Sequence, residues 1–328
     1  MTNLPFTAPP PADFGGPCLI GECRVEPELM LPTTRYFGLV KAGSYLYGTL
    51  RDPGGNLLRM LRGVESHDST MRSLFAAEPG KQLASHPRAE EMWLGPTSIT
   101  READNVVFQS VGAPEQGGFT FVSTSTGIRW DDATVLSVEG EAVGPAIQWF
   151  NTWAGGACFS ATAKYRVRGT FLGRAVEGFA GHEIHYFPAG LGWLDGPYGS
   201  GREICWQQVA NEYEDGTLIQ GTFAYGQDGW GFAMLHDEDG RFVATTDVRA
   251  EATVRPNGYP ETIRYEFSGQ SWTWRIDAQG ERPMVTELPL RGADGTCRRD
   301  GDSRAVRYSM GNSDWWTDGR ADPIVVRS

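Results

Sequence analysis

Short segments rich in Val, Thr, Phe, Tyr and Trp recur almost regularly along this sequence from Asp104 onward. Turn-forming residues separate them, as in Glu214-Asp215-Gly216 and Pro256-Asn257-Gly258. Segments that repeat about every 8–12 residues with turn signals between them are typical of antiparallel sandwiches and barrels. The sequence therefore predicts an all-β fold, with strands at Phe119–Thr124, Ala133–Val138, Ala146–Trp153, Ser160–Val167, Ala175–Phe179, Glu203–Glu212, Leu218–Tyr225, Gly231–His236, Arg241–Thr246, Arg249–Arg255, Glu261–Phe267, Ser271–Ile276 and Met284–Leu290.

Helical patterns are confined to two stretches, Ser66–Ala77 and Arg88–Leu94, which we predict to be helices. So little helix cannot build a Rossmann fold or an α/β barrel. No GxGxxG or GxxxxGK[ST] motif follows a predicted strand, so we expect no nucleotide cofactor, and indeed no cofactor at all. A length of 328 residues fits two domains or one large β structure.

The charge balance limits the partners of the chain. Lys and Arg number 29 against 41 Asp and Glu, a net charge of −12. Such a surface repels phosphate backbones and anionic lipid, so we expect no nucleic-acid partner. No apolar run approaches the length of a transmembrane helix, which predicts no membrane span.

The N-terminus and the cysteines bear on location. Residues 1–17 are Pro-rich, without a basic start or an apolar core, and are predicted to be a flexible arm rather than a signal peptide. Five cysteines are scattered without a CxxC pair, at Cys18, Cys23, Cys158, Cys205 and Cys297. This odd set predicts reduced thiols and a cytoplasmic protein. We also expect the protein to be a monomer or a homodimer.

The segment from Lys164 to Glu183 (KYRVRGTFLGRAVEGFAGHE) joins a strand, a Gly turn and a Val-Glu-Gly-Phe strand to an acidic, His-containing segment. With the Trp- and Gly-containing stretch up to Gly199, it resembles the two-domain lipocalin-like superfamily of hydroxyneurosporene synthase (carotenoid 1,2-hydratase) and AttH-type proteins. Relatives often carry Asp-His-x-Trp-Gly at this crossover, whereas this chain keeps an Asp and a Tyr there but neither the His nor the Trp.

The resemblance implies two consecutive lipocalin-like antiparallel β-barrels, covering residues 18–190 and 191–328. It also implies chemistry without a redox cofactor on hydrophobic substrates: hydration, cyclisation or cycloaddition. Bacterial monoterpenol dehydratases of the linalool type are a neighbouring group.

The densest ionisable cluster of this His-poor chain is His182, Glu183 and His185. On a strand, positions 182 and 185 face opposite ways, so zinc binding is not expected and no metal site is predicted. Glu183 and His185 share a face, where a carboxylate sets the tautomer and basicity of an imidazole. Proton transfer is one interpretation of this pair, and a hydrogen-bond network at the domain junction is the other.

Asp195 and Tyr198 lie in the turn-rich stretch between the two halves. An Asp beside aromatic walls would be held protonated by desolvation, and a Tyr could pass a proton to a leaving oxygen. The alternative is that Asp195-Gly196-Pro197 is simply a turn.

Strand parity selects a second set of residues. Trp230, Phe232, Met234 and His236 fall on one face of their predicted strand, while Ala233 and Leu235 fall on the other. The aromatic face would line a cavity or pack in a core, and His236 could equally be a satisfied edge residue. We predict a substrate-binding set of His182, Trp206, Tyr225, Trp230, Phe232, His236 and Trp149. Asp314-Trp315-Trp316 is interpreted as the closure of a barrel end or the cap of a pocket mouth, with packing as the alternative.

Together these features predict a cofactor-independent acid–base lyase, of the hydratase or dehydratase type, acting on a small hydrophobic alcohol or alkene such as a terpenoid. Glu183, His185, Asp195 and Tyr198 are the predicted proton-handling residues. An isomerase or cyclase would use the same groups, and a non-catalytic carrier of hydrophobic ligands would use the same fold. No GxSxG motif is present, which disfavours hydrolase chemistry.

Overall fold

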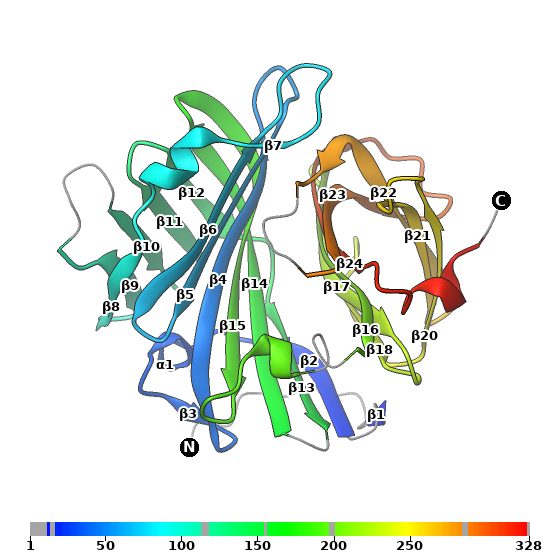
Figure 1. Ribbon diagram of the computed structural model, residues 1–328, viewed down its shortest axis with the longest axis horizontal. Helices are drawn as coiled ribbons and strands as arrows, with labels where there is room; N and C mark the ends of the chain where they lie inside the picture. Colours follow the sequence, from blue (N-terminus) through cyan, green and yellow to red (C-terminus); the bar gives the residue numbers. More distant parts are fainter. Residues whose placement is uncertain are drawn as a thin grey trace.

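Antiparallel pairing of neighbouring strands organises this chain into two sheets, each curled into a barrel (Figure 1). The computed structural model describes residues 12–13, 17–112, 118–153, 156–196, 201–283 and 288–326. The predicted all-β fold with two barrels and very little helix is confirmed. The short helices are α1 (Pro27–Met30), η1 (Pro87–Glu91), η2 (Trp193–Asp195) and η3 (Asp322–Ile324).

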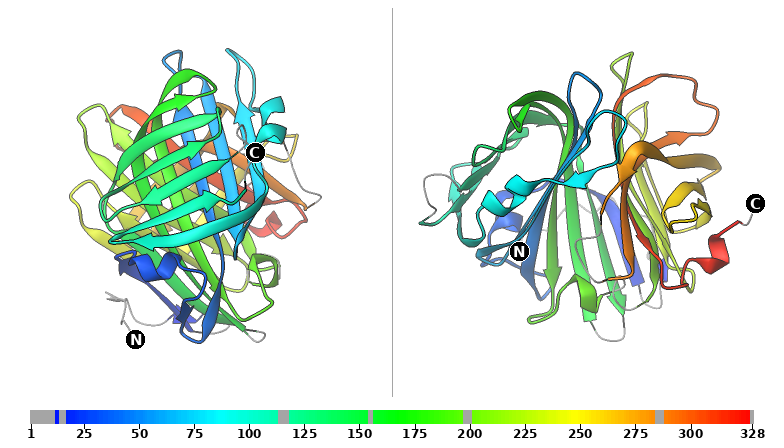
Figure 2. Two further views of the ribbon diagram at one scale, coloured as in Figure 1. Left: turned by 90° about the vertical axis from the view of Figure 1, so that its left-hand side faces the viewer. Right: turned by 45° about the horizontal axis from the view of Figure 1, so that its top comes forward.

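The N-terminal barrel is closed by ten strands of the described chain, because the long strand β14 pairs with both β12 and β15. Around the barrel these are β14 (Gly156–Phe171), β12 (Leu136–Ala142), β11 (Gly127–Asp132), β10 (Phe119–Ser123), β9 (Asn105–Ser110), β8 (Gly95–Glu102), β6 (Asp68–Ala76), β5 (Leu57–Glu65), β4 (Leu39–Arg51) and β15 (Arg174–Phe187). The left-hand view of Figure 2 shows how these strands wrap around the barrel. The first half of β14 also pairs with β13, which continues the sheet outward through β2 and β1. These and the two remaining short strands are β13 (Ala146–Trp153), β2 (Pro17–Cys23), β1 (Ala12–Asp13), β3 (Arg35–Tyr36) and β7 (Ala84–Ser85).

The C-terminal barrel is a sheet of nine strands within the described residues, and it is nearly closed. In order these are β19 (Phe242–Thr245), β18 (Gly231–His236), β17 (Leu218–Gly226), β16 (Glu203–Tyr213), β24 (Val306–Trp316), β23 (Leu290–Arg299), β22 (Gln270–Glu281), β21 (Pro260–Phe267) and β20 (Val248–Val254). The predicted domain boundary between residues 190 and 191 lies in the connection from β15 to β16. Two residues of the predicted N-terminal arm form β1, which pairs with β2.

Alternation along the strands sorts side chains between each barrel interior and the face shared by the two barrels. On β18, Ala233 and Leu235 pack in the core of the C-terminal barrel, whereas Phe232 and Met234 join a separate cluster with Ile147 and others from the N-terminal half. The predicted parity of this strand is therefore confirmed. Each shared strand is buried on both sides, so it carries apolar residues on both faces.

This burial on both faces explains why the predicted helix over Ser66–Ala77 is wrong. The segment is instead strand β6, paired with β5 from Leu58↔Ala76 onward. Leu74 faces the core of the N-terminal barrel and Phe75 faces the other way, so adjacent apolar residues imitate helical spacing. The predicted helix over Arg88–Leu94 is only the 3₁₀ turn η1.

The two barrels lie side by side (the right-hand view of Figure 2). Buried polar contacts join them. Lys164 Nζ in β14 donates to Gly221 O and, at 3.3 Å, to Thr222 Oγ1 in β17. Thr49 Oγ1 in β4 donates to Asp294 Oδ1 in β23 over 3.0 Å. Because these donors leave one barrel and find acceptors in the other, they fix how the two sheets face each other.

Candidate functional site

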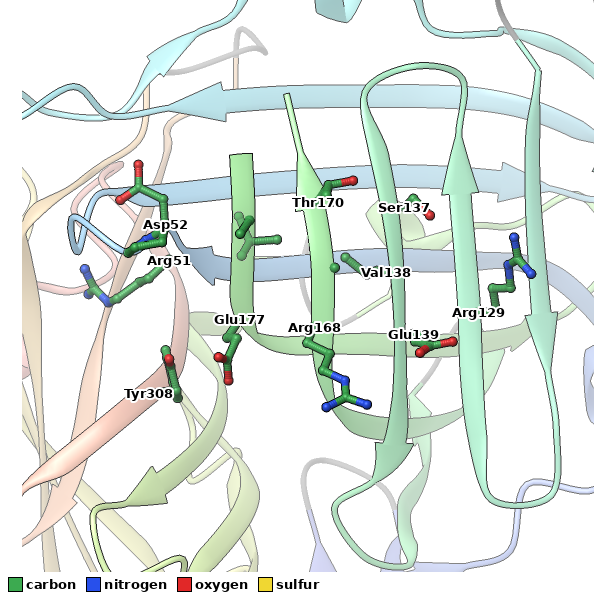
Figure 3. A pocket seen from close by; sticks show the side chains of 14 residues that line it. Arg51, Asp52, Arg129, Ser137, Val138, Glu139, Arg168, Thr170, Glu177 and Tyr308 are labelled. Atoms are coloured by element: carbon green, nitrogen blue, oxygen red, sulfur yellow. The ribbon is translucent and has the colours of Figure 1, made fainter. Parts of the chain in front are cut away.

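A hollow of about 710 Å³ lies on the outside of the N-terminal barrel (Figure 3). Opposite charges stand directly across neighbouring strands in it, in the order Arg129, Glu139, Arg168, Glu177 and Arg51. Such cross-strand pairs stabilise a sheet modestly and are exposed to water here. This groove is therefore a surface charge ladder, without the buried groups that acid–base chemistry needs.

A second hollow, with a volume of about 210 Å³, lies between the two barrels, and we name it the interbarrel pocket. One wall comes from the outer face of the N-terminal barrel: Tyr45, Tyr47, Arg59, Leu61, Met71, Ser73, Phe75, Glu183 and His185. The other comes from the C-terminal barrel and its loops, with Trp193 from η2: Glu203, Trp206, Gln208, Arg282, Pro283, Leu288, Leu290, Gly292, Asn312 and Asp314.

Glu183 and His185 lie together in this pocket, on the shared face that strand parity predicted. His185 Nε2 is 3.8 Å from Glu183 Oε1, and its Nδ1 is 3.2 Å from Ser160 Oγ. Burial raises the pKa of Glu183 to about 7, and the charge of Asp314 adds to the rise, while the charge of Lys164 opposes it. Burial, together with the charge of Lys41, lowers the pKa of His185 to about 3, so its imidazole is neutral at neutral pH.

Glu203, at the start of β16, is the second buried carboxyl group of the pocket, and only 3% of the residue is exposed. Its Oε1 accepts a hydrogen bond from Trp316 Nε1 over 3.2 Å, while its Oε2 has no partner among the described residues. Burial, with the charges of Asp314 and Glu183, raises the pKa of Glu203 to about 8. Glu203 therefore keeps its proton at neutral pH.

The raised pKa of Glu203 predicts a pH-dependent stability difference between the wild type and Glu203→Gln. Between pH 4.5, the ordinary value, and about 8 the folded chain holds a proton that the unfolded chain has released. The unfolded state is therefore favoured as pH rises through this range. We expect the free energy of unfolding of the wild type to fall relative to that of Glu203→Gln from pH 5 to pH 8, measured by urea unfolding. A constant difference across this range would contradict the raised pKa.

A cluster of charged and amide groups occupies the part of the pocket next to the carboxyl groups. Asp294 lies 3.8 Å from Arg59 Nη1 and 3.2 Å from Arg282 Nε. Arg282 Nη2 also donates to Asn312 Oδ1 over 2.7 Å and lies 3.3 Å from Asp314 Oδ1. The two guanidinium groups are thus balanced by two carboxylates.

Asp195, another predicted proton-handling residue, is not among the residues that line this pocket. Asp195 is exposed at the end of η2, where its Oδ2 accepts a hydrogen bond from Gly192 N over 2.8 Å. This contact fits the turn interpretation. Tyr198 lies outside the described residues.

Of the predicted substrate-binding residues, only Trp206 lines the interbarrel pocket. Trp149, Trp230 and Phe232 pack with it in one buried aromatic cluster, in which the ring centroids of Trp149 and Trp206 are 5.6 Å apart. For these three residues the packing interpretation fits best. Tyr225 packs against the core of the C-terminal barrel.

The two histidines of the predicted substrate-binding set, His182 and His236, lie outside the interbarrel pocket. His182 points into the N-terminal barrel, where its ring meets Phe108 and Phe121 edge to face. His236 lines a separate hollow of about 350 Å³, with its Nε2 3.8 Å from Glu22 Oε2. Burial lowers the pKa of both, to about 3 for His182 and about 4 for His236.

Sequence reasoning missed Glu203 as a site residue, together with the Arg59 and Arg282 cluster. Strict alternation places Glu203 and Trp206 on opposite faces, but the β-bulge between Glu203 and Cys205 shifts the register, and both line the pocket. Asp314 carried a signal, because Asp314-Trp315-Trp316 was interpreted as a possible pocket cap. Asp314 does line the pocket.

Comparison with solved structures finds proteins of similar fold. No protein-family model and no curated protein matches the sequence. An AttH-like protein from Nitrosomonas europaea is 16% identical with a TM-score of 0.47, over 83% of this chain and 90% of that one. Kievitone hydratase from Nectria haematococca is 10% identical with a TM-score of 0.44, over 84% and 89%. CghA is 12% identical with a TM-score of 0.42, over 84% and 88%. At these values the similarities carry no argument about the site, which rests on its own geometry.

The helices and the cysteines of the described residues bear on the predicted absence of a membrane span and on the predicted reduced thiols. Within the described ranges, no helix has the length and apolar character to cross a bilayer. The cysteines whose side chains are described, Cys23, Cys158, Cys205 and Cys297, are all free and buried.

Proposed function

We propose that this protein is an acid–base lyase of the hydratase or dehydratase type, acting in the interbarrel pocket on a hydrophobic alcohol or alkene. One observation carries the proposal: two buried carboxyl groups, Glu183 and Glu203, enter one pocket from different barrels with pKa values of about 7 and about 8. Dehydration needs one group that gives a proton and another that takes one at the same pH. Two carboxyl groups whose pKa values are raised to neutrality meet this need.

The pKa order assigns the two roles. In dehydration, Glu203 gives its proton to the leaving hydroxyl group, the carbon–oxygen bond breaks and water departs. The Glu183 carboxylate then takes the proton of the neighbouring carbon, whose C–H electron pair becomes the new double bond. Hydration is the reverse. His185, neutral and held near Ser160, positions the Glu183 carboxylate from 3.8 Å away.

The apolar part of the pocket favours a hydrocarbon-rich substrate, and we propose a terpenoid. Leu61, Met71, Phe75, Trp206 and Leu290 line it. These side chains exclude water from a cation-like intermediate, and the indole face of Trp206 stabilises positive charge. The resemblance of residues 164–199 to carotenoid 1,2-hydratases supports the same reaction class.

The proposed function is tested by incubating purified protein, without added cofactor, with a panel of tertiary allylic alcohols and their alkenes. Gas chromatography–mass spectrometry then detects products. Elimination or hydration products above a heat-denatured control are expected. Rearranged or cyclised isomers instead would assign the isomerase or cyclase alternative, because the same proton groups serve both. Saturable binding without any product would assign the carrier alternative.

The two pKa values predict a bell-shaped pH profile for the turnover rate. Below pH 7 the Glu183 carboxylate takes up a proton and no longer acts as a base. Above pH 8 Glu203 loses the proton that it donates. We expect the rate to be highest between pH 7 and 8 and to fall about tenfold per pH unit well outside this range. A rate independent of pH between 5 and 9 would contradict the assignment.

A further inference from the structure

Apart from Arg282 Nε, which lies 3.2 Å from Asp294 Oδ2, three buried hydrogen-bond donors of residues lining the interbarrel pocket have no partner among the described residues. They are the Tyr47 hydroxyl, Arg59 Nε and Gln208 Nε2, and all three residues are almost completely buried. A buried donor without an acceptor destabilises the folded protein. Three such donors at one pocket therefore indicate a place where an acceptor atom binds.

Each of the three groups faces the pocket as a donor for a separate reason. A guanidinium group has only donors. The amide oxygen of Gln208 accepts a hydrogen bond from Thr222 Oγ1 over 2.8 Å, which leaves its NH₂ group toward the pocket. Burial, with the charge of Glu183, raises the pKa of Tyr47 well above its ordinary value, so its hydroxyl keeps the proton.

The three residues line the same pocket, Tyr47 and Arg59 from one wall and Gln208 from the other, and we name them the donor cluster. The Arg59 guanidinium lies 5.5 Å from the centre of the Tyr47 ring. That ring lies flat over Gly181, where a Cβ atom would come within 2.2 Å of it. Across the pocket, Gln208 stands opposite Asn312 in the strand register, and Asn312 is hydrogen-bonded to Arg282.

The donor cluster is displaced by two residues from Glu183 along the paired strands β4 and β15. On the wall formed by the N-terminal barrel, Tyr47 pairs with Gly181 and Tyr45 with Glu183. Two residues of a strand span about 7 Å. The acceptor atom of a ligand would therefore lie about 7 Å from the position where Glu183 acts.

The charges of the cluster favour a neutral acceptor. Arg59 and Arg282 are already balanced by Asp294 and Asp314, so an added carboxylate would lie unpaired in a buried site. The Asn312 and Gln208 oxygens already accept hydrogen bonds, so the proton of a ligand hydroxyl would find no free amide acceptor there. A carbonyl oxygen, which only accepts, matches this end of the pocket better than a hydroxyl or a carboxylate.

We propose that the donor cluster of Tyr47, Arg59 and Gln208 binds a neutral carbonyl oxygen, so that the substrate class is a hydrophobic ketone, ester or enone. The reacting alcohol or alkene then lies about 7 Å from that oxygen, at Glu183. This inference rests on the proposed function, because that function places the reacting carbon at the carboxyl groups.

The test measures binding to the full-length Glu183→Gln variant, in which the proposed reaction is blocked and the ligand stays intact. The probes are geranylacetone, which is a ketone, the alcohol obtained by reducing it, and the hydrocarbon of the same skeleton, titrated by isothermal calorimetry. The ketone is expected to bind at least about tenfold more tightly than the hydrocarbon, and more tightly than the alcohol.

Adding Tyr47→Phe, which keeps the ring, is expected to weaken ketone binding about three- to tenfold and to leave hydrocarbon binding unchanged. Gln208→Met is a second variant with the same expected effect. The matched control is Tyr213→Phe, because Tyr213 is also buried but packs in the core of the C-terminal barrel. This control is expected to change neither affinity.

Equal binding of ketone and hydrocarbon would overturn the carbonyl subsite. So would equal effects of Tyr47→Phe and Tyr213→Phe on ketone binding. These outcomes are independent of turnover by the wild type. A ketone preference without any turnover would overturn the lyase proposal and support the carbonyl subsite. Turnover without a ketone preference would support the lyase proposal and overturn the carbonyl subsite.

Discussion

Replacement of Glu183 by Gln is expected to lower turnover about 10²- to 10⁴-fold, while the protein stays folded. The amide keeps the shape of the side chain but cannot take a proton from carbon. Binding of the substrate should change little, because the variant removes a proton acceptor and not the pocket. The measurement is kcat and KM by gas chromatography on an alcohol or alkene that the wild type converts.

Glu177→Gln provides the matched control for this variant. Glu177 lies on the same strand, β15, but belongs to the exposed charge ladder outside the pocket. We expect its turnover to stay within about twofold of the wild type, since a surface charge pair is worth little. Equal losses in the two variants, or full activity of Glu183→Gln, would contradict the role given to Glu183.

Arg62→Met is expected to destabilise the protein by about 3–5 kcal/mol. The Arg62 guanidinium forms two hydrogen bonds of 2.6 and 2.7 Å with Asp132, and both side chains are completely buried in the N-terminal barrel. Burial raises the pKa of Asp132, and the charge of Arg62 opposes that rise. Without Arg62 the carboxylate would be buried and unpaired, so unfolding should require much less urea.

The double variant Arg62→Met, Asp132→Leu separates the loss of a partner from the loss of packing. Removing both charges leaves no unpaired carboxylate, so we expect it to recover most of the lost stability. If the double variant is as unstable as the single one, the stability lost comes from packing and from the hydrogen bonds of Arg62 to Ser69 and Trp93 O.

The sequence was most informative where local pattern and tertiary burial agree. Most strands between Phe119 and Ile276 follow turn chemistry, which is local, and were predicted to within a few residues. The predicted strand Ala133–Val138 is wrong, because it spans the turn between β11 and β12, and β15 continues to Phe187, beyond the predicted end at Phe179. Strands β23 and β24 were not predicted, and the predicted strand Met284–Leu290 meets β23 only at its last residue. The segment Ser66–Ala77 was misassigned because its two faces meet two different cores. The burial of the outer face of β6 depends on the second barrel, which covers it. A local sequence pattern carries no information about that barrel.

The residues of the candidate site follow the same rule: regular alternation along one strand was predictable, whereas a bulge and contacts between the barrels were not. Glu183 and His185 were found because two residues on one regular strand share a face. Glu203 was missed because a bulge breaks the alternation at the start of β16. Arg59 and Arg282 come from segments more than 200 residues apart in the sequence, and only the docking of the barrels brings both to Asp294.

Hydration in D₂O, followed by mass spectrometry of the alcohol formed, tests the acid–base lyase most directly. In the wild type the carboxyl groups exchange their protons with solvent, and Glu183 delivers a deuteron to the carbon adjacent to the one that gains the hydroxyl group. The account predicts one carbon-bound deuterium per product molecule, with product formation abolished or nearly so in Glu183→Gln and Glu203→Gln. Saturable binding of the same alkenes, without product and without deuterium on carbon, would contradict it.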